Sequence, residues 1–161
     1  MTRRVALSTT HLMWNVALGG HAWVFLNWAL GLQSIDCEVV LLEHLKLDED
    51  ADPQAAVEGL RRFRSSLQAL GLEPQLAYLA SDSQRERMRP VQRDLDAVAT
   101  AVEDLAPECD LLLNFRYALP REAIARFRRS ALVDIDPGLL QCWMDGGHVT
   151  PARHDLYFTI G

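Results

Sequence analysis

Between residues 4 and 42, two short aliphatic runs enclose a glycine pair and a long apolar helical segment. The runs are 4–7 and 37–42, and Gly19 and Gly20 open the helical segment. A strand, a glycine-rich turn, a helix and a second strand form the opening unit of a parallel α/β sheet. Because such sheets bind ligands at the carboxyl ends of their strands, we expect the first helix to begin at the ligand-binding edge.

The same alternation continues along the rest of the sequence. It predicts an α/β fold: a single Rossmann-like domain over 1–161, with a parallel sheet of about six strands in the order 3-2-1-4-5-6 and helices on both faces. The later strands are expected at 75–80, 110–115, 131–135 and 156–160. Helices are expected over about 20–34, from Pro53 to a stop at Gly71, over 95–105, and after Pro120 and Pro137.

Composition excludes several classes of function. The net charge of −6 gives no long-range attraction to phosphate backbones, so nucleic acid is not an expected partner. The apolar run 22–32 is shorter than the ~20 residues that a membrane span needs, and we expect no such span. Cys37, Cys109 and Cys142 show no Cys-x-x-Cys spacing, which favours a cytoplasmic protein with reduced, mostly buried thiols.

His21 is the candidate catalytic residue, because it lies in the first turn of the expected first helix. The free N–H groups and the positive end of the helix dipole favour an anion there and disfavour an imidazolium. A neutral imidazole can accept a proton from a substrate. The alternative is a tight turn at Gly19 and Gly20 followed by a structural histidine. The spacing matches neither Gly-x-Gly-x-x-Gly nor a P-loop.

Polar residues also follow two later strands. Arg116 comes directly after the strand at 110–115, where it could hold a phosphate or carboxylate, although a salt bridge to a nearby acid is the commoner outcome. Asp134 and Asp136 spell Asp-x-Asp, which can bind a divalent metal, but helix capping already accounts for Asp136. We therefore expect no metal and no cofactor.

The first helix has no clearly polar face, since Asn27 is the only polar residue between His21 and Gln33. A helix that is apolar all round should be covered on a second side. Either a partner surface packs on it, which predicts a homodimer, or the preceding loop with Trp14 folds over it.

Three stretches carry a resemblance to a known family. They read GGHAWVFLNWALGL at 19–32, LVDIDPG at 132–138 and HDLYFTIG at 154–161. Together they resemble the N-terminal half of a bacterial glycosyltransferase of the two-Rossmann GT-B type. The resemblance implies a domain that mainly binds the acceptor and faces, across a cleft, a C-terminal domain that binds most of the nucleotide sugar.

The resemblance also implies roles for individual residues. Gly19 and Gly20 match the glycine turn that approaches the donor phosphates, and His21 falls where several such enzymes place a histidine. We assign Arg116 to the same phosphates. With the donor-binding half absent, we expect an incomplete transferase that handles nucleotide sugar and acceptor only with a second domain. The alternative is a non-catalytic domain that binds a ligand or another protein.

Overall fold

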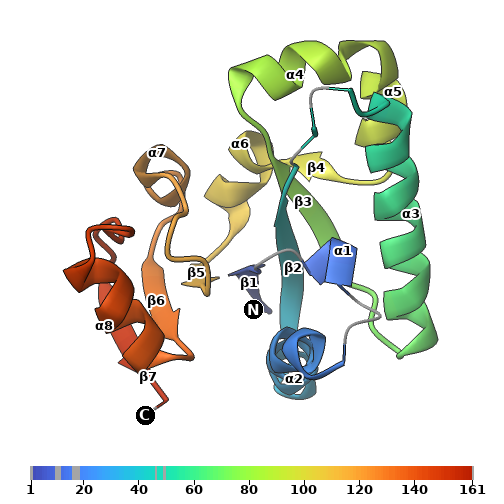
Figure 1. The fold of residues 1–161 in the computed structure, drawn as a ribbon. Coiled ribbons are helices and arrows are strands. Elements are labelled where there is room, and N and C mark those ends of the chain that lie inside the picture. Colours follow the sequence, from blue (N-terminus) through green and yellow to red (C-terminus); the bar gives the residue numbers. More distant parts are fainter. Residues whose placement is uncertain (1, 10–11, 16–18, 46, 49, 161) are drawn as a thin grey trace.

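A seven-stranded, all-parallel sheet forms the centre of the fold, in the order β4-β3-β2-β1-β5-β6-β7 (Figure 1). The computed structural model of the chain describes residues 2–9, 12–15, 19–45, 47–48 and 50–160. The strands are β1 Arg3–Ser8, β2 Cys37–His44, β3 Gln75–Leu79, β4 Thr100–Ala101, β5 Leu111–Asn114, β6 Ser130–Asp134 and β7 Leu156–Thr159.

The expected strands are present and lie in the expected order, but the sheet has one strand more than predicted. The additional strand, β4, has two residues and pairs with β3 at the edge of the sheet. Its register joins Ala77 to Thr100 and Tyr78 to Ala101. A strand of this length shows no alternation of apolar and polar residues, so the sequence pattern could not indicate it.

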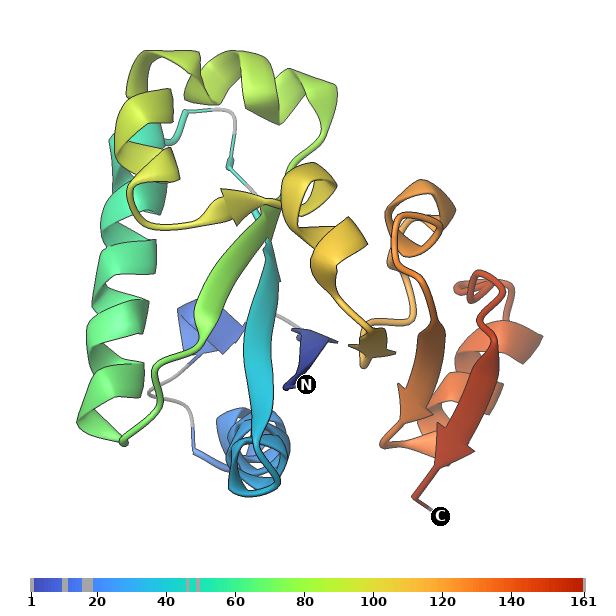
Figure 2. The ribbon, with the colours of Figure 1, turned by 180° about the vertical axis from the view of Figure 1, so that it is seen from behind.

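Helices cover both faces of the sheet, as the alternating pattern predicts (Figures 1 and 2). Neighbouring strand residues such as Val5 and Ala6 belong to two separate buried clusters, because successive side chains of a strand point to opposite faces. No helix in the described part of the chain is long and apolar enough to cross a membrane. The helices are α1 Leu12–Asn15, α2 Gly20–Ser34, α3 Pro53–Ala69, α4 Asp82–Met88, α5 Gln92–Asp96, α6 Val102–Leu105, α7 Arg121–Ile124 and α8 Pro137–Asp145, with 3-10 turns η1 Arg89–Val91 and η2 Ala106–Glu108.

The prediction of a single helix over residues 95–105 is wrong. The structure has α5, then the edge strand β4, then α6 in this region. Leu95 and Val98 are buried in the cluster on one face of the sheet, whereas Val102 and Leu105 are buried in the cluster on the other face. The chain therefore crosses the sheet edge between these pairs, which one continuous helix could not do.

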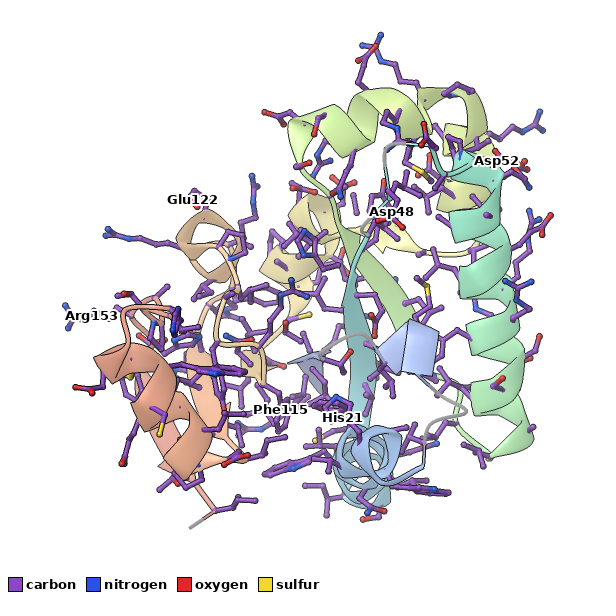
Figure 3. All side chains as sticks on the ribbon, in the orientation of Figure 1. His21, Asp48, Asp52, Phe115, Glu122 and Arg153 are labelled. Atoms are coloured by element: carbon purple, nitrogen blue, oxygen red, sulfur yellow. The ribbon has the colours of Figure 1, made fainter. Side chains whose placement is uncertain are left out.

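Side-chain caps fix the starts of two helices where the sequence places them. The carboxylate of Asp52 accepts a hydrogen bond of 3.0 Å from the Gln54 N–H, and Pro53 is the first residue of α3. Figure 3 labels Asp52 at that end of the helix. In the same way, Asp136 accepts a hydrogen bond of 3.2 Å from the Leu139 N–H at the start of α8. These bonds satisfy N–H groups that have no partner inside the helix.

The apolar helix α2 buries one side and exposes the other. Phe25 is fully buried, and its ring meets that of Phe115 edge to face with centroids 5.5 Å apart. Trp23 and Trp28 are 46% and 37% exposed. The other expected cover, the loop with Trp14, lies outside the described side chains. The sheet of the domain itself covers the side of α2 that carries Phe25. A homodimer formed through the exposed side chains stays a prediction.

Strand β7, at the opposite edge of the sheet from β4, is also exposed. From behind, β7 is fully visible and no described helix lies in front of it (Figure 2). Its exposed apolar side chains, together with that of the residue that follows it, are Leu156, Tyr157, Phe158 and Ile160. Exposed apolar side chains therefore occur both on α2 and on the C-terminal strand and the residue after it.

The cysteines only partly match the expectation of mostly buried thiols. Cys109 is buried, Cys37 is half-buried and Cys142 is exposed, so the expectation is wrong for Cys142. Burial raises the pKa of the Cys109 thiol to about 11, which keeps the thiol protonated and poorly nucleophilic at neutral pH.

Candidate functional site

A cavity of about 420 Å³ lies at the carboxyl ends of β5 and β6. Its walls come from the first turn of α2, from the segments that follow β5 and β6, from α8 and from Val149 in the loop after α8. This is the edge at which parallel α/β sheets bind ligands, and the volume is in the usual range for small-molecule sites. The cavity is therefore the candidate binding site of the domain.

Two of the residues predicted from sequence meet at this cavity. His21 and Arg116 both line it, although they come from different elements, whereas Gly19 and Gly20 are exposed and do not line it. The His21 ring packs edge to face on Phe25 with centroids 5.1 Å apart. Figure 3 labels both His21, on α2, and Phe115, at the end of β5. The first turn of α2 thus points at the same space as the segment after β5.

Gly19 determines how the chain enters α2. It is the N-cap residue, with φ 69° and ψ −130°, a conformation that is almost restricted to glycine. Its carbonyl oxygen accepts hydrogen bonds from the N–H groups of Ala22 and Trp23. A Cβ atom built on Gly19 would meet no atom within 4 Å. The glycine is therefore required by backbone conformation and not by close packing.

Gly19→Ala is expected to lower the free energy of unfolding by about 1–3 kcal/mol, because alanine pays the strain of the positive φ. Gly20→Ala is the matched control, since Gly20 has no positive φ and also has open space around its Cβ position. We expect the control to change stability by less than about 1 kcal/mol, in the stabilising direction. Urea unfolding of both variants measures this, and equal effects would contradict the assignment of strain to Gly19.

The backbone of Arg116 is held by the buried amide of Asn114, which is itself bonded to the buried imidazole of His154. The Asn114 side-chain amide donates to the Arg116 carbonyl oxygen at 3.0 Å and accepts from the Arg116 N–H at 2.9 Å. His154 Nδ1 donates to the Ala152 carbonyl oxygen at 2.7 Å, because a carbonyl can only accept. His154 Nε2 is then free of a proton and accepts from Asn114 Nδ2 at 3.0 Å. Burial lowers the pKa of His154, which favours this neutral ring.

Arg116 is half-buried, and two of its three guanidinium nitrogens have no partner among the described residues. Its Nε and Nη1 atoms are shielded from solvent and have no hydrogen-bond partner among the described residues. The salt bridge that the sequence left open as an alternative is not seen in the described part of the chain. Burial lowers the pKa of Arg116, whereas the charge of Glu43 raises it. Arg116 therefore carries a charge that no carboxylate among the described residues neutralises through a salt bridge.

Glu43, at the carboxyl end of β2, is a carboxyl group that the sequence did not single out as a site residue. It is 1% exposed and accepts hydrogen bonds from the Thr9 hydroxyl and from the backbone N–H groups of Met13 and Leu12. Burial raises the pKa of Glu43 to about 7, and these bonds and the charge of Arg116 oppose the rise. Its burial depends on α1, which no local pattern around residue 43 indicates.

The two carboxylates of the Asp-x-Asp motif have structural partners. Asp134 Oδ1 accepts from the Tyr117 hydroxyl at 2.6 Å and from the Asp136 N–H at 3.1 Å, while Asp136 caps α8. Burial, together with the bond to Asp134, raises the pKa of Tyr117 and keeps the phenol protonated. Within the described residues, no group of three or more His, Cys, Asp and Glu side chains could hold a metal ion.

Aromatic side chains form much of the cavity, and the sequence did not single them out. Phe115 and Tyr117 flank Arg116 in the chain, and Trp143 comes from α8. The Tyr117 and Trp143 rings meet edge to face with centroids 6.1 Å apart. The aromatic residues on both sides of Arg116 were a signal that could have been used. Trp143 could not have been found in this way, because its place depends on the packing of α8.

Comparison of the chain with protein-family models, with curated proteins and with solved structures gave no match.

Proposed function

We propose that this chain is the acceptor-side domain of a GT-B type glycosyltransferase, which transfers a sugar from a nucleotide sugar to an acceptor hydroxyl group. In this proposal the cavity at the ends of β5 and β6 binds the acceptor. A second Rossmann-like domain holds most of the nucleotide sugar. The proposal rests on the three stretches of sequence that resemble this family and on the geometry of the cavity.

One observation carries the proposal further than the fold does: His21 and Arg116 line one cavity at the ligand-binding edge of a parallel sheet. His21 is proposed as the general base that removes the proton from the acceptor hydroxyl as the glycosidic bond forms. Arg116 supplies positive charge for an anionic group of a substrate. Gly19 and Gly20, at the start of α2, are proposed to face the donor phosphates, where helix N–H groups favour anions.

A non-catalytic ligand-binding or interaction domain is the second candidate. The observation that favours it is the exposed apolar surface on α2 and β7, which is typical of surfaces that bind other proteins. In that case the cavity binds a ligand without turnover, and replacing His21 affects no reaction.

Glycosyl transfer is tested with the protein as its gene encodes it, with UDP-glucose, GDP-mannose and dTDP-glucose as donors. The readout is release of nucleoside diphosphate that depends on added acceptor. His21→Ala is expected to lower turnover by about 10²–10⁴-fold, the usual contribution of a general base, while donor binding is retained. The 161-residue chain alone is expected to bind nucleotide sugars weakly, because most donor contacts are proposed to lie in the other domain.

His148→Ala is the control, because His148 is an exposed histidine that does not line the cavity. Its turnover should equal that of the unmodified protein. Full turnover by His21→Ala would show that His21 is not the general base. Tight, sugar-specific binding by the 161-residue chain would contradict the assignment of the donor to a second domain. Release of nucleoside diphosphate from none of the donors would favour the non-catalytic domain.

A further inference from the structure

We propose that the cavity binds an acceptor that contains a flat ring and carries a negatively charged group, and that Arg116 binds this group. That the ligand is the acceptor rests on the proposed function. The chemistry of the ligand follows from the walls of the cavity and from the surroundings of Arg116, whatever reaction the domain takes part in.

The walls favour a flat ring. Tyr117 and Trp143 line one space of about 420 Å³. Phe115 also lines it but is only 3% exposed, because its ring packs on Phe25 and Trp28. Aromatic side chains bind flat rings well, because stacked and edge-to-face contacts add to the burial of apolar area. The remaining apolar wall is formed by Ala118, Ile135, Leu139 and Val149.

The aromatic wall is also held in place. The Tyr117 hydroxyl donates to Asp134, which fixes the direction of the ring, and the Trp143 ring packs against it. Asp134 is 8% exposed, so solvent competes little for this bond. A ring that enters the cavity therefore meets a prepared surface, and little side-chain freedom is lost on binding.

The charge at the cavity favours an anion on that ring. Arg116 lines the cavity, and its shielded Nε and Nη1 atoms have no acceptor among the described residues. An arginine that no carboxylate neutralises through a salt bridge can form a charge-assisted hydrogen bond with a carboxylate or phosphate. The carboxylate that lines the cavity, Asp136, already accepts the Leu139 N–H at the start of α8. Asn114 holds the Arg116 backbone and is itself bonded to His154, so the backbone that carries this side chain is fixed before the ligand arrives.

The same geometry argues against the donor phosphates as the partner of Arg116, which is where the sequence pattern placed it. Phe115 and Tyr117 stand beside Arg116, whereas Gly19 and Gly20, the other residues assigned to the phosphates, do not line the cavity. A diphosphate group is strongly hydrated and gains little from an aromatic wall, so the part of a donor that this wall would hold is its base, and uridine diphosphate enters the test for that reason. An organic anion uses both the ring surface and the guanidinium group.

The test compares two probes on the folded chain by isothermal titration calorimetry. The probes are 4-hydroxybenzoate and 4-hydroxybenzamide, which share ring, hydroxyl and shape but differ in charge. We expect the benzoate to bind about tenfold or more tightly than the amide, as a charge-assisted hydrogen bond implies. Arg116→Gln should remove this preference. Arg121→Gln, an exposed arginine on α7, should retain it.

Each outcome decides the proposal. Equal affinity of the unmodified chain for both probes, or no binding of either, overturns it, and this comparison needs no variant to fold. Trp143→Leu should weaken the binding of both probes by the same factor. An unchanged affinity for both would overturn the proposal that the aromatic wall binds the ring of the ligand. Uridine diphosphate is added as a competitor. If it displaces the benzoate from the unmodified chain but does not bind Arg116→Gln, Arg116 binds the donor phosphates and the inference is overturned. Transfer to an uncharged aliphatic acceptor would overturn this inference while leaving the proposed function intact.

Discussion

Phe25→Ala is expected to lower the free energy of unfolding by about 3–5 kcal/mol, a large fraction of the stability of an ordinary domain. Phe25 is 0% exposed and packs between α2 and the sheet. Its ring meets those of His21 and Phe115 edge to face, at 5.1 and 5.5 Å. Truncation removes both contacts and leaves a cavity next to two residues that line the candidate site.

Trp23→Ala provides the comparison for this variant, because Trp23 lies two positions earlier on the same helix and is 46% exposed. Guanidinium unfolding, followed by far-UV circular dichroism, should show a much smaller loss for Trp23→Ala. If both variants lost the same stability, the exposed face of α2 would be packed against something in solution. That result would support self-association through this face, and light scattering on the same samples would detect it.

Glu43→Gln is expected to remove a dependence of stability on pH that amounts to about 3 kcal/mol. The pKa of Glu43 is raised from its usual value of 4.5 to about 7 by burial. Below pH 4.5 both the folded and the unfolded protein hold the proton, so the contribution to stability is fully present. Between pH 4.5 and 7 only the unfolded chain releases it, and stability falls by about 1.4 kcal/mol for each pH unit.

The measurement is the difference in unfolding free energy between the unmodified protein and Glu43→Gln at several pH values from 4.5 to 8. Taking the difference cancels the other titrating groups. The difference should shift in favour of the glutamine variant as pH rises, and then stay constant above pH 7. Glu122→Gln, which replaces an exposed carboxyl on α7 that Figure 3 labels, is the control for the loss of one carboxyl group at the surface. A constant difference for Glu43→Gln would show that Glu43 is ionised in the folded protein throughout this range.

The sequence by itself determined the elements whose causes are local. Aliphatic runs that are buried on both faces predicted the strands, and the alternation with helical segments predicted a parallel sheet and the order of its six longer strands. Asp52 and Asp136 set the first turns of α3 and α8 because capping involves only residues two or three positions apart. The position of His21 in the first turn of α2 follows from the glycine pair in the same way.

Tertiary structure alone decided the features that depend on contacts between distant parts of the chain. Val98 and Val102 have the spacing of one helix, yet they lie on opposite faces of the sheet because the chain passes around the edge strand β4 between them. Helical spacing is the same whichever face a residue packs on, so the pattern could not show the break.

The candidate site shows the same division. The sequence placed His21 in the first turn of a helix and Arg116 at a strand end, but their meeting in one cavity depends on β5 lying next to β1 in the sheet. The bond from Asn114 to His154 spans 40 positions, and the raised pKa of Glu43 depends on burial beneath the N–H groups of α1. Burial and hydrogen bonding across such separations arise only when the elements pack, because each requires groups that are far apart in the chain to exclude water together.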